Sequence, residues 1–458
     1  AFLVDTLTTL FPQCGGTGHP APSPDALRAL AAQDPEARAA LDGEAPCQTL
    51  FRRLDQAAGW TRGSLSPQAV EALYGKKVAM SASRMDQYQS CHFAYFLRYG
   101  LQAKDRRPAG FDAPAYGSFV HFVLERVLRA LRNQGGAAQA EEETIRALTA
   151  QAVEDYVRQE LGGMAHQTPR FRYLFYRLER SVQAVVDNVV AELRDSDFQP
   201  ICFELGFGPG QDLPPVEITQ GGVTLRISGF VDRVDGWVED GRLYLRVVDY
   251  KTGRKSFDLT EVWNGLGLQM LLYLFTLEEE GEALFGRRPV PAGVLYLPAR
   301  DAMVAGSRTM DEAARRRLLD KELLRRGLIL DQEEVVQAME HGAGELRFLP
   351  LRVSARTGKI TGEALVSAQK LGRLKQHIAH TLGQICQEIA RGNIDADPFW
   401  RGPNRNACQY CVYAPACHFE EDTDCRHWVP SVRNREFWDW LAQEEGEGGK
   451  DHARTENP

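Results

Sequence analysis

The spacing of apolar residues divides the chain into helical stretches that flank a block of alternating residues. Apolar positions recur every three or four residues from Tyr116 to Leu131 and again in residues 143–194, which predicts long amphipathic helices. The period then changes to two, which predicts strands, in CFELGF, VTLRISGFVDRVDGWV and RLYLRVVDY. Helical spacing returns in residues 259–280, and a further buried strand is predicted in AGVLYLPA. This order of elements predicts an α/β protein.

Two short signals place element boundaries. Glu239-Asp240-Gly241 lies between two predicted strands, and this composition favours a tight hairpin turn that brings those strands side by side. In SASRMDQYQSCHFAYFLRYGL, residues 81–101, aromatic residues recur at core spacing. We expect Ser83 to cap the helix that this segment forms.

Length and composition indicate a globular protein. The chain has 458 residues, of which 43% are hydrophobic and 25% charged. This length exceeds one simple core, so we expect two or three domains or one much-elaborated domain. No run of 18 apolar residues occurs, which argues against a membrane span. Because the sequence begins at Ala1 without an initiator Met or a signal-peptide pattern, we expect a piece of a longer protein.

The cysteine content indicates the cellular compartment, and the net charge limits the kinds of binding partner to be expected. Nine cysteines, an odd number without a secretory signal, predict a reducing compartment, and we expect a cytoplasmic location. A net charge of −8 argues against nucleic-acid binding by bulk charge, so any DNA contact needs local basic surface. Two segments offer it, RFRYLFYRLER (Arg170–Arg180) and RRRLLDKELLRR (Arg315–Arg326). The simpler interpretation of each is an amphipathic helix with a solvated basic face.

The stretch RVVDYKTG, residues 246–253, ends an apolar strand with opposite charges two positions apart. Because residues i and i+2 of a strand share a face, Asp249 and Lys251 point together while Tyr250 turns away and leaves its carbonyl free. Asp232 lies on the preceding strand, which the hairpin brings close. Clustered carboxylates need counter-charge, and a hard divalent cation such as Mg²⁺ or Mn²⁺ supplies it. With a lysine beside it, such a cation suits phosphodiester hydrolysis.

Four motifs, in order, resemble those of the RecB-like branch of the PD-(D/E)XK nuclease superfamily. They are a GxxxH helix ending at His121, a GxxDRxD strand from Gly229 to Asp235, the strand Asp249–Gly253, and a QxxxY helix from Gln269 to Tyr273. The resemblance implies a restriction-endonuclease-like core with a mixed central sheet flanked by helices. It also implies that Lys251 is catalytic, that Gln269 and Tyr273 line the site near the DNA, and that metal is bound by His121, Asp232, Asp249 and the Tyr250 carbonyl.

Each motif alone has a simpler explanation. A surface Asp–Lys pair would account for DYK, and a lone His121 on a helix is more often packed or exposed than a ligand. Asp235 could replace Asp232 as a ligand, although it faces the opposite side of a regular strand. Glu125, one turn after His121, either supports the ligands or is merely solvated. Glu204 could support the sheet edge or the site, and the pattern does not assign it.

The C-terminal part of the chain contains CQYCVYAPAC, which has a C-x2-C-x5-C spacing. Thiolates three residues apart around a tight loop are typical metal ligands. A fourth ligand must come from elsewhere, and the candidates are Cys91, Cys425, Cys386 and His418. A structural zinc held by the three local cysteines with Cys425 or His418 is one interpretation.

Both cysteine segments are similar to those of the B subunits of bacterial AddAB helicase–nucleases. In that family one cysteine precedes the nuclease core in a context like residues 81–101, and three follow the core as C-x2-C-x5-C. The resemblance implies a [4Fe–4S] cluster that staples the two ends of the nuclease domain, held by Cys91, Cys408, Cys411 and Cys417. His92 departs from the pattern, because the family usually has Pro after this cysteine.

The resemblance covers roughly residues 79–430 and suggests three parts. Residues 1–77 would be the trailing part of a preceding helicase-like region, 78–430 the nuclease domain, and 431–458 a partly disordered tail. It implies a Mg-dependent DNA exonuclease that processes double-strand ends for recombinational repair with an AddA-type helicase–nuclease subunit, away from any membrane. The alternatives are a freestanding iron–sulfur exonuclease of the Cas4 type, which the length argues against, and a non-catalytic DNA-binding module. The intact set of Asp232, Asp249 and Lys251 argues against the second.

Overall fold

A computed structural model describes residues 63–104, 111–164, 167–253, 257–306, 309–421 and 424–444. From Ser64 onward the described residues form one compact unit, so α5 (Pro67–Tyr74) and β1 (Lys77–Met80) belong to the same unit as the central sheet. Most of the predicted preceding region and residues 445–458 lie outside the described residues, and both assignments stay predictions. None of the helices in the described ranges is long and apolar enough to cross a membrane.

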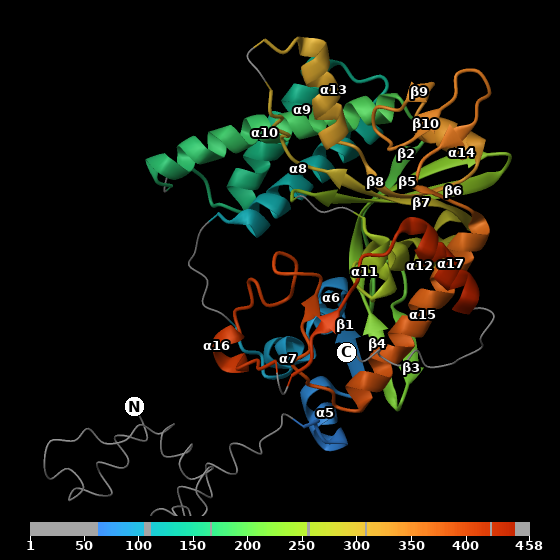
Figure 1. The fold of residues 1–458 in the computed structure, drawn as a ribbon. Helices are drawn as coiled ribbons and strands as arrows, with labels where there is room; N and C mark the ends of the chain where they lie inside the picture. Colours follow the sequence, from blue (N-terminus) through green and yellow to red (C-terminus); the bar gives the residue numbers. More distant parts are fainter. Residues whose placement is uncertain are drawn as a thin grey trace, which may run out of the picture. The chain divides into compact units, whose positions relative to one another are not determined.

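A six-stranded mixed sheet forms the centre of this unit (Figure 1). Its strand order is β12–β8–β7–β6–β5–β2. The strands span Gln199–Phe207 (β2), Gly229–Glu239 (β5), Arg242–Lys251 (β6), Pro289–Pro298 (β7), Arg326–Leu330 (β8) and Leu365–Val366 (β12). The predicted hairpin is confirmed, because β5 and β6 pair antiparallel from Glu239↔Arg242 onward, while β6 and β7 pair in parallel. The expected mixed α/β core is therefore present.

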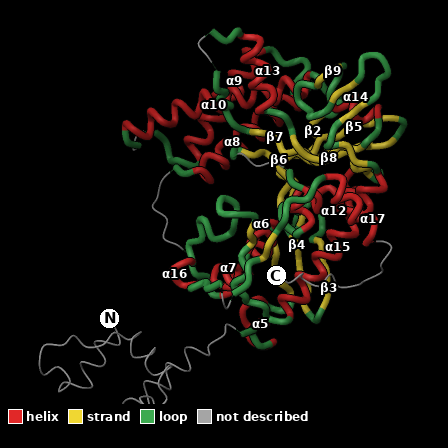
Figure 2. The backbone as a smooth tube through the Cα atoms, viewed as in Figure 1, coloured by secondary structure: helices red, strands yellow, loops and turns green. Residues whose placement is uncertain are grey.

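Helices cover both faces of this sheet (Figures 1 and 2). On one face lie α8 (Ala113–Asn133), α9 (Glu142–Gln159) and α10 (Pro169–Arg194), which confirm the long helices predicted in residues 116–131 and 143–194. On the other lie α11 (Leu259–Trp263), α12 (Gln269–Phe285), α15 (Ala368–Ala390) and α17 (Asn434–Glu444). Helix α12 packs directly on β6 and β7, and the side chains of its N-terminal half, Met270–Leu277, are buried all round. Strand β6 is consequently covered on both faces.

A network of buried charges fixes α10 to the sheet. The Glu192 carboxylate lies 3.0 Å from Arg325 Nε and 3.1 Å from Arg246 Nη2. Asp235 in turn lies 2.8 Å from Arg233 Nε and from Arg246 Nε. All five side chains are almost completely buried. Because Arg325 belongs to this network, the helix predicted in residues 315–326 ends earlier, as α13 (Glu312–Glu322).

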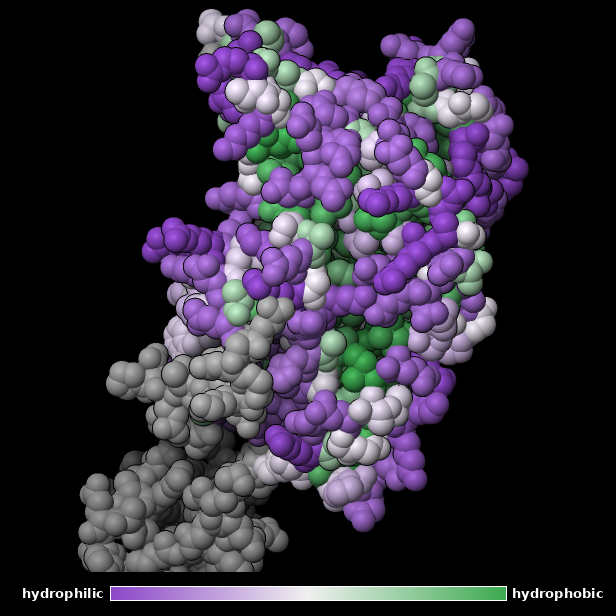
Figure 3. Space-filling view, turned by 90° about the vertical axis from the view of Figure 1, so that its right-hand side faces the viewer, coloured by the Kyte–Doolittle hydropathy of each residue, from purple (hydrophilic) through white to green (hydrophobic). Residues whose placement is uncertain are grey.

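A smaller three-stranded sheet brings the N-terminal segment to the C-terminal helices. Strand β4 (Val223–Ile227) pairs antiparallel with β3 (Val216–Gln220) and in parallel with β1, and this sheet packs on α15. On the face drawn in Figure 3, polar side chains predominate and apolar ones show only in scattered areas. The remaining elements are short: α14 (Glu333–Met339), β9 (Gly344–Glu345), β10 (Arg352–Val353), β11 (Ile360–Thr361), β13 (Phe399–Trp400), α16 (Ala414–Cys417) and β14 (His427–Trp428).

The segment around Cys91 differs from its prediction. Ser81, not Ser83, caps α6 (Ala82–Ser90), because Ser81 has an extended backbone and its Oγ accepts a hydrogen bond from the Arg84 amide. The chain then becomes extended at Cys91 and continues as α7 (His92–Tyr95) and a π-helical turn, η1 (Phe96–Gly100). The break places Cys91 at a junction between helices and not on a helix face.

Candidate metal centre and cysteine cavity

The end of β6 presents an ion pair on one face. Lys251 Nζ lies 2.5 Å from Asp249 Oδ2, as the alternation of strand residues predicts. Tyr250 turns to the opposite face, where its ring is buried and its hydroxyl lies 3.5 Å from Arg233 Nη1. The Asp249 side chain is only 7% exposed. Burial, followed by the charge of Asp232, raises the pKa of Asp249 to about 6, although Lys251 opposes the shift.

Asp232 and His121 converge on the same strand end. The Asp232 carboxylate accepts a hydrogen bond from the Tyr250 amide at 2.8 Å. His121, on α8, donates from Nε2 to the Tyr250 carbonyl at 3.0 Å, and its Nδ1 lies 3.5 Å from Asp232 Oδ1. Burial opposes the charged imidazole, but the hydrogen bond to Asp232 outweighs it and raises the pKa of His121. Oxygen atoms therefore surround this position and favour a positive charge there.

Glu204, which the sequence pattern left unassigned, belongs to this cluster. Within the described ranges, one group of three side chains brings its possible ligand atoms within 4.8 Å of one another, and it consists of His121, Glu204 and Asp232. Glu204 lies on β2 between Phe203 and Leu205, whose partners on β5 flank Asp232. Its backbone is left-handed, with φ 50°. Burial of the carboxylate and the charge of Asp232 raise the pKa of Glu204 to about 7.

Gln269 and Tyr273 line the neighbouring side of the strand end. Gln269 Nε2 donates to the Tyr273 hydroxyl at 3.0 Å. A Cβ atom at Gly229 would collide with that hydroxyl, so the glycine of the GxxDRxD strand makes room for the tyrosine of the QxxxY helix. The two motifs are thus sterically linked, a relation that neither motif reveals by itself.

Two alternatives from the sequence are resolved by their contacts. Asp235 points away from Asp232 into the buried arginine network and is unsuited to bind a metal at this site. Glu125 pairs with Arg129 at 2.8 Å; like Asp249, it lies outside the group of three close ligand residues, and its pairing favours a supporting or solvated role. The fold thus brings His121, Asp232, Asp249, the Tyr250 carbonyl and Lys251 to one strand end.

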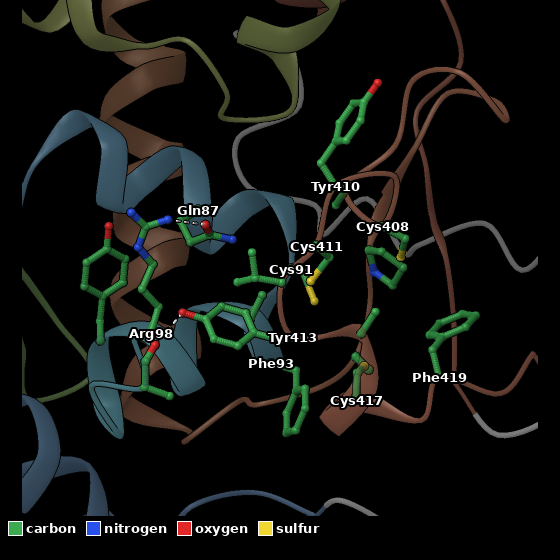
Figure 4. A pocket seen from close by; sticks show the side chains of 18 of the residues that line it. Gln87, Cys91, Phe93, Arg98, Cys408, Tyr410, Cys411, Tyr413, Cys417 and Phe419 are labelled. Carbon is green, nitrogen blue, oxygen red and sulfur yellow. Dashed lines mark hydrogen bonds between the residues drawn. The ribbon is translucent and has the colours of Figure 1, made fainter. Parts of the chain in front are cut away.

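The cysteines surround a cavity of about 1230 Å³ in another part of the unit. Figure 4 shows Cys91, from the N-terminal segment, in the same pocket as the C-terminal cysteines, and the four thiols that line it are Cys91, Cys408, Cys411 and Cys417. The Tyr413 hydroxyl donates to the Ala103 carbonyl at 2.7 Å, and both residues line the cavity. Two segments far apart in the sequence therefore form its lining together.

Among the other candidates for a fourth ligand, only His418 also lines the cavity. Cys386 is buried on α15, where its Sγ donates to the Ile218 carbonyl at 3.3 Å, and Cys425 is exposed. No three of the described cysteines bring their sulfur atoms within 4.8 Å of one another.

His92, the departure from the family pattern, is buried between two carboxylates. Its Nδ1 lies 2.6 Å from Asp397 Oδ2 and its Nε2 3.1 Å from Glu388 Oε2. The His92 amide also donates to Asp397 Oδ1 at 3.1 Å. Burial alone would lower the pKa of His92, but the hydrogen bonds to Asp397 and Glu388 raise it to about 9. A charged His92 thus joins the Cys91 segment to the chain that leads to Cys408.

Comparison with known proteins agrees with this geometry. Residues 79–418 match the family model described as the PD-(D/E)XK nuclease superfamily. The B subunit of the ATP-dependent helicase/deoxyribonuclease of Clostridium novyi is 30% identical over 386 residues, which cover 83% of this chain and 34% of the relative. The protein of the same name from Desulforudis audaxviator is 34% identical over 361 residues, which cover 78% and 31%. The chain therefore spans about a third of the length of these curated relatives.

Proposed function

Because the chain belongs to the PD-(D/E)XK nuclease superfamily, we propose that it hydrolyses phosphodiester bonds of DNA with a divalent metal ion. One observation carries the proposal: an imidazole, three carboxylates and a lysine meet at the end of a single strand. The carboxylate and imidazole ligands His121, Asp232, Asp249 and Glu204, together with the Tyr250 carbonyl, form a donor set that suits Mg²⁺ or Mn²⁺.

The roles of the side chains follow from their charges and positions. A bound Mg²⁺ or Mn²⁺ would polarise the phosphate and lower the pKa of a water molecule. Lys251, held by Asp249 and partly exposed, is placed to orient the attacking water and to offset charge developing on the phosphate. Gln269 and Tyr273 offer amide and hydroxyl groups to the DNA at the same rim.

Two variants test this site. Asp249→Asn and Lys251→Ala should abolish Mg²⁺-dependent cleavage of oligonucleotides while circular dichroism shows an intact fold. Asp240→Asn and Lys359→Ala, which change the same residue types in two exposed turns, should cleave normally. Retention of cleavage in both site variants would refute the assignment.

We also propose that Cys91, Cys408, Cys411 and Cys417 hold a [4Fe–4S] cluster. A single tetrahedral zinc, with Zn–S bonds of about 2.3 Å, needs sulfur atoms about 3.8 Å apart. The thiols here surround a wider space, which suits the larger cubane. Anaerobically purified protein should contain iron and acid-labile sulfide and absorb in the visible range. Cys91→Ser should lose the iron, the sulfide and the visible absorption, whereas Cys202→Ser, on β2, should keep all three. Stoichiometric zinc without iron would exclude the cluster.

The relatives named above suggest the wider context. Similarity to the Clostridium novyi relative extends over 83% of the chain, well beyond the four motifs, which favours a piece of such a helicase-associated protein over a freestanding exonuclease. In that context the nuclease would act on DNA ends beside an AddA-type helicase partner. Strand-specific degradation, measured with and without that partner, tests this part of the proposal: degradation that the partner leaves unchanged would count against it.

A further inference from the structure

The N-terminal half of α10 exposes a face rich in tyrosine and arginine. Tyr173 and Tyr176 are 64% and 60% exposed, and Leu174 is 47% exposed. At 100° per residue, these side chains share one face of the helix with three exposed arginines, Arg170, Arg177 and Arg180. The opposite face, with Phe171 and Phe175, packs on the core. In Figure 1 this half of the helix projects beyond its neighbours.

The arginines on this face differ from those of the second basic segment. On α13, Arg315 lies 3.5 Å from Glu312 and Arg316 lies 3.4 Å from Asp320, while the nearby Arg325 is buried in the network around Glu192. Among the described residues, no ion pair within 4.0 Å involves Arg170, Arg177 or Arg180. Their positive charge therefore remains available, in a chain whose net charge is −8.

This face lies on the helix that packs beside α8, which carries His121 of the proposed metal centre. The Tyr116 hydroxyl lies 3.1 Å from Ser181 Oγ and so joins the start of α8 to α10. Phe111 contacts Phe175 and Phe119 edge to face, at 6.1 and 6.4 Å between ring centroids. His121 lies on α8 five residues after Tyr116. These contacts therefore fix the exposed face of α10 relative to the proposed site.

We propose that this face of α10, Arg170 to Arg180, binds single-stranded DNA beside the nuclease site. Tyrosine rings in solvent stack on bases of any sequence, and interleaved arginines pair with the phosphates between those bases. The arginines span about 15 Å of helix, so the contact covers a short stretch of strand. The inference rests on the proposed nuclease function and adds a binding surface to it.

Binding of fluorescein-labelled oligo(dT) in EDTA, where no cleavage occurs, tests the aromatic contribution. The double variant Tyr173→Ala/Tyr176→Ala should bind more weakly, by about five- to a hundredfold for each ring lost. The double variant with Phe at both positions should bind like the unmodified chain, because the stacking surface is kept. Equal binding by the Ala and unmodified chains would overturn the proposal.

A charge-matched pair of variants tests the arginines. Arg170→Ala/Arg177→Ala/Arg180→Ala should bind weakly and reduce the slope of log K against log salt by about two. Arg315→Ala/Arg316→Ala/Arg317→Ala removes the same charge from α13 and should leave binding unchanged. Equal losses in both variants would mean that bulk charge, not this face, binds the strand.

Two further readouts separate this inference from its alternatives. If the α10 variants keep oligo(dT) binding but lose association with a helicase subunit, the face is a protein interface and the proposal fails. The nuclease assignment is tested separately: it fails if the unmodified chain does not hydrolyse thymidine 5′-(4-nitrophenyl phosphate) in the presence of Mg²⁺. Strand binding by a chain that hydrolyses this ester is the expected result.

Discussion

At the scale of single residues, the proposed metal centre brings carboxylates close together. Asp249 is buried next to Asp232, and Glu204 lies within 4.8 Å of both Asp232 and His121. The charge of Asp232 adds to burial in raising the pKa of Asp249 and of Glu204. A divalent ion bound at the proposed site would relieve this repulsion.

This repulsion predicts how ion binding depends on pH. The pKa values of Asp249 and Glu204, about 6 and about 7, lie above the usual carboxyl range, so below them an incoming ion must displace protons. Affinity for Mn²⁺, measured by isothermal titration calorimetry, should rise as the pH passes through about 6 and about 7, and go on rising until His121, whose pKa is raised, has lost its proton. Glu204→Gln should bind Mn²⁺ less tightly and lose the part of the rise near pH 7. A pH-independent affinity would contradict this account.

The raised pKa of His92 predicts that stability falls as the pH rises, whereas the affinity for Mn²⁺ should increase. Its pKa rises from about 6.5 in the unfolded chain to about 9 in the fold, so its contribution is complete below about 6.5 and is lost as the pH rises through about 9. The difference is of the order of 3 kcal/mol. Urea unfolding across this range should show the decline in the unmodified chain and not in His92→Gln. Parallel declines in both would assign the effect to other groups.

The sequence allowed part of the site to be predicted and concealed the rest. Alternation along a strand was enough to place Asp249 with Lys251 and to turn Tyr250 away. Glu204 escaped assignment because its left-handed backbone interrupts the regular alternation of β2. Asp397 and Glu388 carry no local signal at all, since their contact with His92 joins residues about 300 positions apart.

At the scale of elements, α10 is anchored at one end and exposed at the other. Glu192, in its C-terminal half, lies among Arg233, Arg246 and Arg325. Burial alone would raise the pKa of Glu192, but Arg325 and then Arg246 and Arg233 lower it to about 2, so the carboxylate stays ionised. The N-terminal half therefore projects from a rigid base.

Removing the Glu192 charge should loosen this base. Glu192→Gln leaves the buried Arg325 without its counter-ion and should lower the free energy of unfolding by about 3–5 kcal/mol. Glu154→Gln, which removes one partner of the exposed Glu154–Arg158 pair on α9, should cost at most about 0.5 kcal/mol. Guanidinium denaturation measures both, and equal small effects would mean that the network adds little stability.

The same network marks the limit of pattern reasoning for elements. Long helices and the β5–β6 hairpin could be predicted because periodicity and turn residues are local signals. The end of α13 could not be predicted, because Arg325 pairs with Glu192 on α10 instead of continuing the helix. A run of basic residues in the sequence does not show which of them will be buried.

At the scale of the whole unit, several contacts join its two ends independently of the cluster proposed at the cysteines. Strand β1 pairs with β4, and the Leu65 and Phe93 amides donate to the carbonyls of Gly392 and Asp395, both at 2.9 Å. A covalent closure between Cys91 and Cys408 would add about 6 kcal/mol in the chain-entropy model. The proposed cluster would therefore reinforce a junction that already exists.

We accordingly expect removal of iron to leave the fold in place. Chelated protein should keep its near-ultraviolet circular dichroism and unfold cooperatively at lower denaturant concentration. Hydrogen exchange should increase chiefly in residues 400–428. Cys91→Ser, which should lack the cluster from the start, serves as the control, because chelation should change nothing in it. Loss of all tertiary signal on chelation would show instead that the cluster nucleates the domain.

The salt link of His92 with Asp397 and Glu388 has a consequence for biogenesis. Because contacts of His92 join the separated segments, the proposed cluster would enter a chain whose thiols already lie near one another. Loading with iron and sulfide would then be a late maturation step, and a colourless preparation of this chain should take up both on reconstitution.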